Sequence, residues 1–165
     1  MRLCRGAGTV FMRLTYFSDY AFRTLMYLAV TPERRCTIRE IAAAYDISRA
    51  HLMKVVNLLT RQGLVTAQRG PSGGLTLAVP ADQIRLGDVV RKTEDDLGLV
   101  ECFRPDNQCR LTPACALAPA LDRAMQAFLA ELDQQTIADI VRRRQTIRCV
   151  LNIEPPASQA SSTRL

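Results

Sequence analysis

The stretch from residue 37 to residue 79 constrains the fold most, because two short helices and a two-stranded hairpin are predicted there with tight turns between them. Thr37-Ile-Arg-Glu40 has the form of a capping box and predicts the start of the first helix. The second helix is predicted to begin after Ser48 and to end at Gly63. Its apolar stripe consists of Leu52, Val55, Val56 and Leu59. The pattern therefore predicts a helix-turn-helix over about residues 38–62.

A β-hairpin wing is predicted over residues 64–79, where two short apolar runs flank the turn Arg69-Gly-Pro-Ser-Gly-Gly74. The second helix of such a unit suits the major groove of DNA, where Arg and Asn can contact bases and Lys can contact phosphates. The candidate DNA contacts are Arg49, His51, Lys54 and Asn57 on the helix and Arg69, Ser72 and Gly73 on the wing. A helical hairpin with a solvated polar face is the alternative, and the wing that follows disfavours it.

The charge distribution agrees with a polyanion partner for the first half of the chain. Residues 13–79 contain nine Lys/Arg and four Asp/Glu, whereas residues 80–165 contain eleven and twelve. No segment has the apolar length of a membrane span, and residues 1–11 lack the pattern of a signal peptide. We therefore expect a cytoplasmic protein whose thiols stay reduced and which has no membrane partner.

Patterning also indicates how the chain is divided. A helix is predicted over residues 18–30, with Ser18 as its N-cap. Met12 begins a better patterned stretch than Met1. The expected units are a disordered extension (residues 1–11), a winged DNA-binding domain (residues 12–80), a cysteine loop with dimerisation helices (residues 81–146) and a disordered tail (residues 147–165). The expected fold class is mainly α with a small β-hairpin.

Three of the six cysteines, Cys102, Cys109 and Cys115, lie within fourteen residues of a predicted loop. Three thiolates on one arm can hold one metal centre, and thiolate-only ligation favours an iron–sulfur cluster or zinc. The gaps of six and five residues contain no C-x-x-C pair, so the zinc-ribbon and thioredoxin signatures are absent. The only histidine, His51, lies on the recognition helix, so a fourth ligand must be oxygen, solvent or a group from elsewhere, including a partner chain.

A long amphipathic helix is predicted after the cysteine loop. Thr112 is the predicted N-cap and Pro113 the first helical residue, which would place Cys115 in the first turn, where the helix dipole favours a thiolate. The apolar stripe of this helix consists of Leu117, Leu121, Met125, Phe128 and Leu132. We interpret the stripe as the seam of a two-fold homodimer, which would present two recognition helices to a palindromic site. The alternative is that it packs back on its own winged domain.

These residues resemble the iron–sulfur winged-helix repressors of the IscR/NsrR superfamily, and most closely the nitric-oxide-sensing NsrR type. The similarity covers about residues 12–144. It rests on Met12-Arg-Leu-Thr-Tyr-Phe-Ser-Asp-Tyr20, the segment from Ser48 to Gly63, Arg69-Gly-Pro-Ser-Gly-Gly74, Ile84-Arg-Leu-Gly-Asp-Val-Val90, Leu99-Val-Glu-Cys102 and Cys109-Arg-Leu-Thr-Pro-Ala-Cys115. The first and last of these segments are the most specific to the NsrR type.

The resemblance implies a dimer with one iron–sulfur cluster per subunit, 4Fe-4S being favoured over 2Fe-2S, held by Cys102, Cys109 and Cys115. It also implies a fourth ligand from the first helix of the other subunit, at Asp19. The residues alone give Asp19 a plainer role, as a first-turn carboxylate favoured by the helix dipole. The biogenesis regulator of the superfamily uses a histidine three residues after the third cysteine, where this chain has Ala118.

The function implied by the resemblance is repression of nitrosative-stress genes, with release of promoter DNA when nitric oxide attacks the cluster. One alternative is an iron-availability or redox regulator of the same fold, and another is a zinc-stapled DNA-binding protein. An enzyme is disfavoured, because the sequence contains no paired acid and base and no nucleophile constellation.

Overall fold

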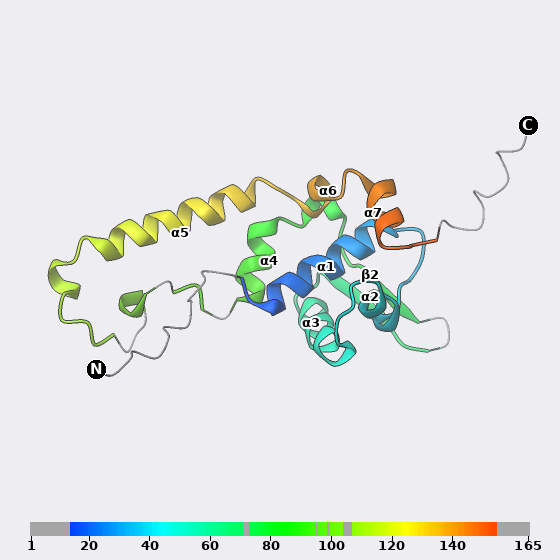
Figure 1. The fold of residues 1–165 in the computed structure, drawn as a ribbon, viewed down its shortest axis with the longest axis horizontal. Coiled ribbons are helices and arrows are strands. Elements are labelled where there is room, and N and C mark those ends of the chain that lie inside the picture. Colours follow the sequence, from blue (N-terminus) through cyan, green and yellow to red (C-terminus); the bar gives the residue numbers. More distant parts are fainter. Residues whose placement is uncertain (1–13, 71–72, 95, 99, 104–106, 155–165) are drawn as a thin grey trace, which may run out of the picture.

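The computed structural model describes residues 14–70, 73–94, 96–98, 100–103 and 107–154. Its elements are α1 (Tyr16–Val30), α2 (Ile38–Ala44), α3 (Arg49–Arg61), β1 (Val65–Gln68), β2 (Gly74–Leu77), α4 (Leu86–Thr93), α5 (Leu117–Asp133), α6 (Ile137–Ile140) and α7 (Arg144–Val150), with short 3-10 turns at Ala81–Gln83, Glu101–Phe103 and Thr112–Ala114. Figure 1 shows a body formed by α1–α4, the hairpin, α6 and α7, from which α5 extends. The predicted class, mostly helical with a small hairpin, is confirmed.

The central helix α1 starts earlier than predicted, and Ser18 is not its N-cap. Thr15 is the cap, with extended backbone (φ −65°, ψ 161°) and a side chain that accepts a hydrogen bond from the Ser18 N–H. Ser18 lies in the first turn of the helix and is fully buried. Its hydroxyl faces α4, where Thr93 lies 2.6 Å away. The sequence alone does not show this long-range partner, so the local pattern predicts a cap instead.

The helix-turn-helix has the predicted form. The capping box at α2 is present, since Glu40 N–H donates to Thr37 Oγ1 (3.1 Å) and Thr37 N–H donates to Glu40 Oε2 (3.4 Å). The turn that follows places Asp46 at φ 51°. Ser48 is the N-cap residue of α3, although its hydroxyl makes no capping hydrogen bond. The buried residues of α3 are Leu52, Val55, Val56 and Leu59, the predicted stripe.

The wing is an antiparallel hairpin in which Val65 pairs with Leu77 and Gln68 pairs with Gly74. It is attached to the helix-turn-helix through a short bridge on the other edge of β2. Cys36 N–H donates to the Leu75 carbonyl (3.0 Å), and Leu75 N–H donates to the Cys36 carbonyl (2.8 Å). Because Leu75 pairs with Ala67 next to the turn, the bridge holds the turn end of the wing to the segment between α1 and α2.

The chain returns to the body after α5, and its last described residues form α7 on the side of α1 away from α3 (Figure 1). Arg148 of α7 donates to the Val30 carbonyl at the end of α1 (3.1 Å) and pairs with Glu33 (2.6 Å). Ile153 is buried. The disordered tail predicted from residue 147 therefore does not begin there, because residues 147–154 contact the body. No helix among the described residues is long and apolar enough to cross a membrane.

Candidate functional site

The recognition helix α3 presents a polar face to solvent. The predicted contact residues Arg49, His51, Lys54 and Asn57 are all exposed on it. Arg61, at its last turn, is exposed as well. The opposite face packs into the core and against α1. A buried stripe that anchors the helix while its polar face stays open is the arrangement that major-groove docking requires.

The wing tip is only partly described. Arg69 is exposed beside Gly70, whose φ of 109° requires glycine. The predicted contact Ser72, with its neighbour Pro71, lies outside the described residues. The predicted contact Gly73 also shapes the turn, because its N–H donates to the Gly70 carbonyl (2.9 Å). A Cβ atom at Gly73 would lie 2.4 Å from the Gln68 carbonyl oxygen, so the turn itself requires this glycine.

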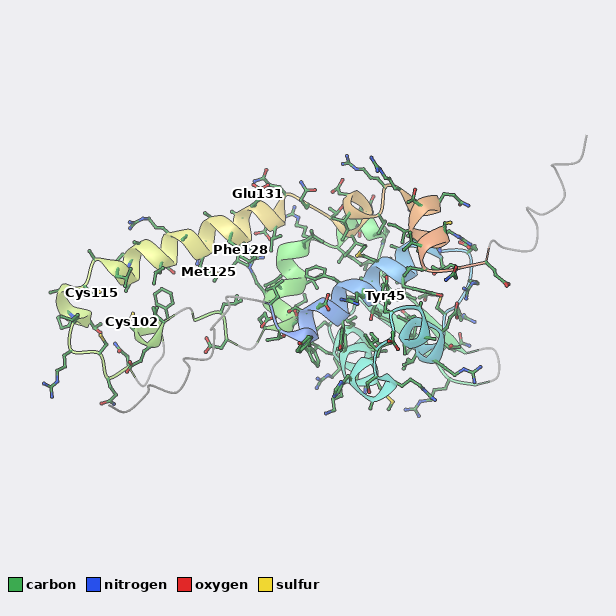
Figure 2. The ribbon with its side chains drawn as sticks, in the orientation of Figure 1. Tyr45, Cys102, Cys115, Met125, Phe128 and Glu131 are labelled. Atoms are coloured by element: carbon green, nitrogen blue, oxygen red, sulfur yellow. The ribbon has the colours of Figure 1, made fainter. Side chains whose placement is uncertain are left out.

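The arm between α4 and α5 carries Cys102, Cys109 and Cys115, which are all free thiols and partly exposed. Cys102 lies in the 3-10 turn Glu101–Phe103, and the Cys109 N–H donates to Asn107 Oδ1 (2.8 Å). Figure 2 shows Cys102 and Cys115 near the end of α5 that is remote from the body. The described residues contain no group of three or more His, Cys, Asp or Glu side chains close enough to hold a metal ion. The arm thus brings the thiols into one region without converging them.

Cys115 does not lie in a helical first turn, which corrects the predicted start of the long helix. Thr112–Ala114 forms a 3-10 turn, Cys115 is extended (φ −83°, ψ 119°), and α5 begins at Leu117. The cause is Pro119. A helix running from Thr112 would place Pro119 in its interior, where the ring would clash with the Cys115 carbonyl four residues earlier. Starting at Leu117 puts Pro119 in the first turn, where proline is tolerated.

Asp19 lies in the first turn of α1 and its side chain is 41% exposed. It pairs with Arg23 of the same helix through two contacts, Nε to Oδ1 at 3.0 Å and Nη2 to Oδ2 at 2.9 Å. The Arg23 guanidinium also lies over the Tyr45 ring, 5.6 Å from its centroid, and burial raises the pKa of Tyr45 to about 12. Helix α1, which carries Asp19, lies in the body (Figure 1), and the described residues of the chain form no metal-ligand group that joins Asp19 to the arm cysteines.

The chemistry of the donor set fits a thiolate-held metal centre at the arm. Its three cysteines are reduced and accessible, and a short segment carries all of them. The other described cysteines do not share this setting. Cys36 is fully buried, with Sγ 3.1 Å from Thr31 Oγ1, and burial raises the pKa of its thiol, which disfavours the thiolate. Cys149 is exposed on α7, on the body rather than on the arm.

The apolar face of α5 has few partners within the described chain. Leu117 is 59% exposed and Phe128 is 40% exposed, and Leu129 is the only buried residue of the helix. Figure 2 shows Met125 and Phe128 on the same side of α5. At its base the helix is held to α4 by a bidentate pair, in which Arg91 Nη1 and Nη2 contact Asp133 Oδ1 and Oδ2 at 2.7 and 2.6 Å. An exposed apolar face on a firmly anchored helix is typical of a protein interface.

Similarity to known proteins extends over most of the chain. A family model described as "Rrf2: Iron-dependent Transcriptional regulator" matches residues 14–143. CymR, the global cysteine regulator of B. subtilis, has 24% identity and a TM-score of 0.64, covering 81% of this chain and 98% of its own. T. potens IscR has 22% identity and a TM-score of 0.65 over 82% of this chain and 90% of its own. The oxidized form of S. aureus CymR has 25% identity and a TM-score of 0.63, covering 78% and 95%.

Proposed function

The chain belongs to the Rrf2 family of transcriptional regulators, and we propose that it is an iron–sulfur-dependent repressor of the NsrR type, which releases promoter DNA in response to nitric oxide and so controls nitrosative-stress genes. Members of this family are DNA-binding regulators rather than enzymes. The observation that carries the proposal is the arm, where three free and partly exposed thiols are joined directly to a winged-helix body. The opening segment and the Cys109–Cys115 segment support the NsrR type.

In this proposal Cys102, Cys109 and Cys115 hold the cluster, one per subunit, and the fourth ligand is Asp19 of the second subunit. When bound, the cluster supplies a centre that reacts with nitric oxide. The thiolates of the arm orient it, and the Asp19 carboxylate would leave its own pair with Arg23 to serve as a weaker oxygen ligand. The DNA-binding unit is residues 12–80 and the sensing unit is residues 81–146.

DNA binding is assigned to α3 in the major groove, with Arg69 of the wing at the phosphates. Regulators of the Rrf2 family act as dimers, and the apolar face of α5 is the proposed seam. A two-fold dimer would present two copies of α3 to the two halves of a palindromic site. Loss of the ligation between arm and α1 would then shift the population away from the DNA-competent arrangement.

The decisive experiment is the absorption spectrum of the anaerobically purified protein, with iron and acid-labile sulfide measured on the same sample and followed by nitric oxide titration. We expect a brown protein whose cluster spectrum and promoter affinity are both lost as nitric oxide is added. A colourless protein that contains zinc would instead support the zinc-stapled alternative. A cluster that changes on iron limitation or oxidation, but not with nitric oxide, would support the alternative of an iron-availability or redox regulator of the same fold.

Replacing Lys54 and Asn57 separately should distinguish phosphate contact from base contact. Lys54→Ala should weaken binding to all sequences and lower the salt slope by about one unit per subunit, because each subunit loses one counterion-releasing contact. Asn57→Ala should cost roughly 1–3 kcal/mol of discrimination between bases. Fluorescence anisotropy at several salt concentrations, with specific and scrambled duplexes, measures both effects.

The matched control is Arg142→Ala, which removes one charge from an exposed side chain next to α6, on the other side of α1 from α3. It should leave the salt slope unchanged. Unchanged affinity after joint replacement of Arg49, His51, Lys54 and Asn57 would refute the assignment of α3 to the groove.

Asp19→Ala should change the cluster spectrum and the nitric oxide response while the fold is kept, since a first-turn carboxylate contributes under about 1 kcal/mol. Ligation across the dimer is tested with a mixed dimer of an Asp19→Ala chain and a chain without the three arm cysteines. Its only cluster then lies opposite an intact Asp19, so the wild-type spectrum is expected there and the altered one in the Asp19→Ala homodimer. An altered spectrum in the mixed dimer would show that ligation is not between chains. Asp88→Asn, another carboxylate paired with an arginine of its own helix, is the control.

A further inference from the structure

A cluster of hydroxyls around one carboxylate joins the end of α4 to the start of α1. Glu94 Oε1 accepts hydrogen bonds from the Thr15 N–H (2.8 Å), from Thr15 Oγ1 (3.0 Å) and from the Ser18 hydroxyl. Ser18 Oγ also lies 2.6 Å from Thr93 Oγ1. Ser18 and Thr93 are buried, so the contact between their hydroxyls is made where the local dielectric is low and hydrogen bonds are strong. The two hydrogen bonds from Thr15 to Glu94 lie at the surface.

The position of these hydrogen bonds is what suggests a role in signalling. Glu94 directly follows the last residue of α4, at the root of the cysteine arm. Thr15 and Ser18 form the N-terminal cap and first turn of α1, the turn that also carries Asp19. Helix α1 in turn packs against the recognition helix α3. One side chain therefore connects the arm to the helix that supports the DNA-binding surface.

We infer that Glu94 is a positioning residue that transmits the state of the cysteine arm to the DNA-binding domain, by holding the first turn of α1 against the root of the arm. The inference rests on the proposed function, because it requires a metal centre on the arm that changes DNA affinity. It adds a route that lies within one subunit and uses neither a cysteine nor Asp19.

The geometry favours transmission over simple capping. Thr15 already caps α1 through its own hydroxyl, which accepts from the Ser18 N–H (3.5 Å). A local capping residue would be enough to cap the start of the helix. Here a carboxylate 76 to 79 residues away also accepts three hydrogen bonds from the same turn. The core residues Val89 and Val90 anchor α4. Because α4 is held in the core, a displacement of the arm at Glu94 would act mainly on the first turn of α1, through these hydrogen bonds.

The test compares DNA affinity with and without the cluster for wild type, Glu94→Ala and Ser18→Ala. Ser18→Ala removes the buried hydroxyl with a residue that favours helix, so it keeps a folded variant available if Glu94→Ala does not fold. The control is Asp82→Asn, which neutralises an exposed carboxylate in the 3-10 turn Ala81–Gln83. The probe is a duplex selected from a random library with the cluster-loaded wild-type protein. Hydrogen exchange at the Thr15 amide, measured in the cluster-free protein, reports whether the contact is broken.

Wild type should bind the duplex more tightly when loaded, by a ratio within the roughly 5- to 150-fold range typical of coupled sites. Both variants should reduce this ratio at least about threefold, and Glu94→Ala should speed exchange at the Thr15 amide. The variant that combines Glu94→Ala with Ser18→Ala should reduce the ratio no further than Glu94→Ala alone, as expected for groups acting through one contact. Asp82→Asn should keep the wild-type ratio. A ratio that is unchanged despite faster exchange, or equal weakening of both forms, would reduce Glu94 to a structural cap and overturn the inference. A wild-type ratio of one would refute the proposed function itself, and this inference with it.

Discussion

Replacing Cys109 with serine should leave the protein unable to retain an iron–sulfur cluster. The three arm thiols are the only described cysteines that share one segment, and a hydroxyl does not replace a soft thiolate as a ligand for such a cluster. Iron and acid-labile sulfide per chain after anaerobic reconstitution should fall to background, because loss of an outer-shell partner alone costs roughly 10- to 100-fold in metal affinity and a direct ligand contributes more. Cys102→Ser and Cys115→Ser should behave in the same way.

The matched control is Cys149→Ser, because Cys149 is a free, exposed thiol on α7 and its replacement disturbs no core packing. It should retain full iron and sulfide. Cys36 is predicted to be dispensable for the cluster too, although it is buried against Thr31 and its replacement tests packing at the same time. Cys4 lies outside the described residues. Full cluster occupancy in Cys109→Ser would contradict the assignment of the arm.

The DNA-binding half was predictable because its signals are local. The capping box at Thr37 and Glu40 and the apolar stripe of α3 each depend on residues three or four positions apart, which are neighbours in any helix. The hairpin follows from two apolar runs and a glycine-rich turn between them. Such features are determined by contacts between residues close in the sequence, so they can be predicted without knowing the tertiary structure.

The errors arose where a distant residue decides a local structure. Ser18 has the properties of an N-cap, but Glu94 and Thr93 engage its hydroxyl inside α1. The sequence predicts a disordered end from residue 147, but Arg148 donates a hydrogen bond to the Val30 carbonyl, 118 residues earlier, and its side chain is only 11% exposed. No sequence pattern predicts such a long-range pair, although the spacing of Ile147 and Leu151 is a helical signal.

The arm shows a different limit. Thr112 and Pro113 carry a genuine helix-start signal, but it is satisfied by a 3-10 turn because a helix begun at Thr112 would have Pro119 in its interior. That rule was available from the sequence. The described residues do not bring the three thiols together, and their proposed convergence would require a metal centre and contacts with a second subunit, which no local pattern in one chain encodes.

Replacing Met125 with glutamate should dissociate the dimer and remove specific DNA binding. Met125 lies on the apolar face of α5 with Phe128, which is 40% exposed in the single chain. In a two-fold seam the change acts twice. Losing two buried side chains of this size removes roughly 3–6 kcal/mol, which corresponds to about two to four decades in the dimer dissociation constant. Two carboxylates in an apolar interface add a further cost.

Sedimentation equilibrium of the cluster-free protein measures the dissociation constant without involving the arm, and anisotropy with a full palindromic duplex measures the consequence for DNA. Ala130→Glu is the matched control, because it adds the same charge to an exposed position on the opposite side of α5. It should leave the dimer intact. A Met125→Glu protein that remains dimeric at micromolar concentration would place the seam elsewhere. Because α5 is anchored to α4 by Arg91 and Asp133, its exposed face would then need another partner.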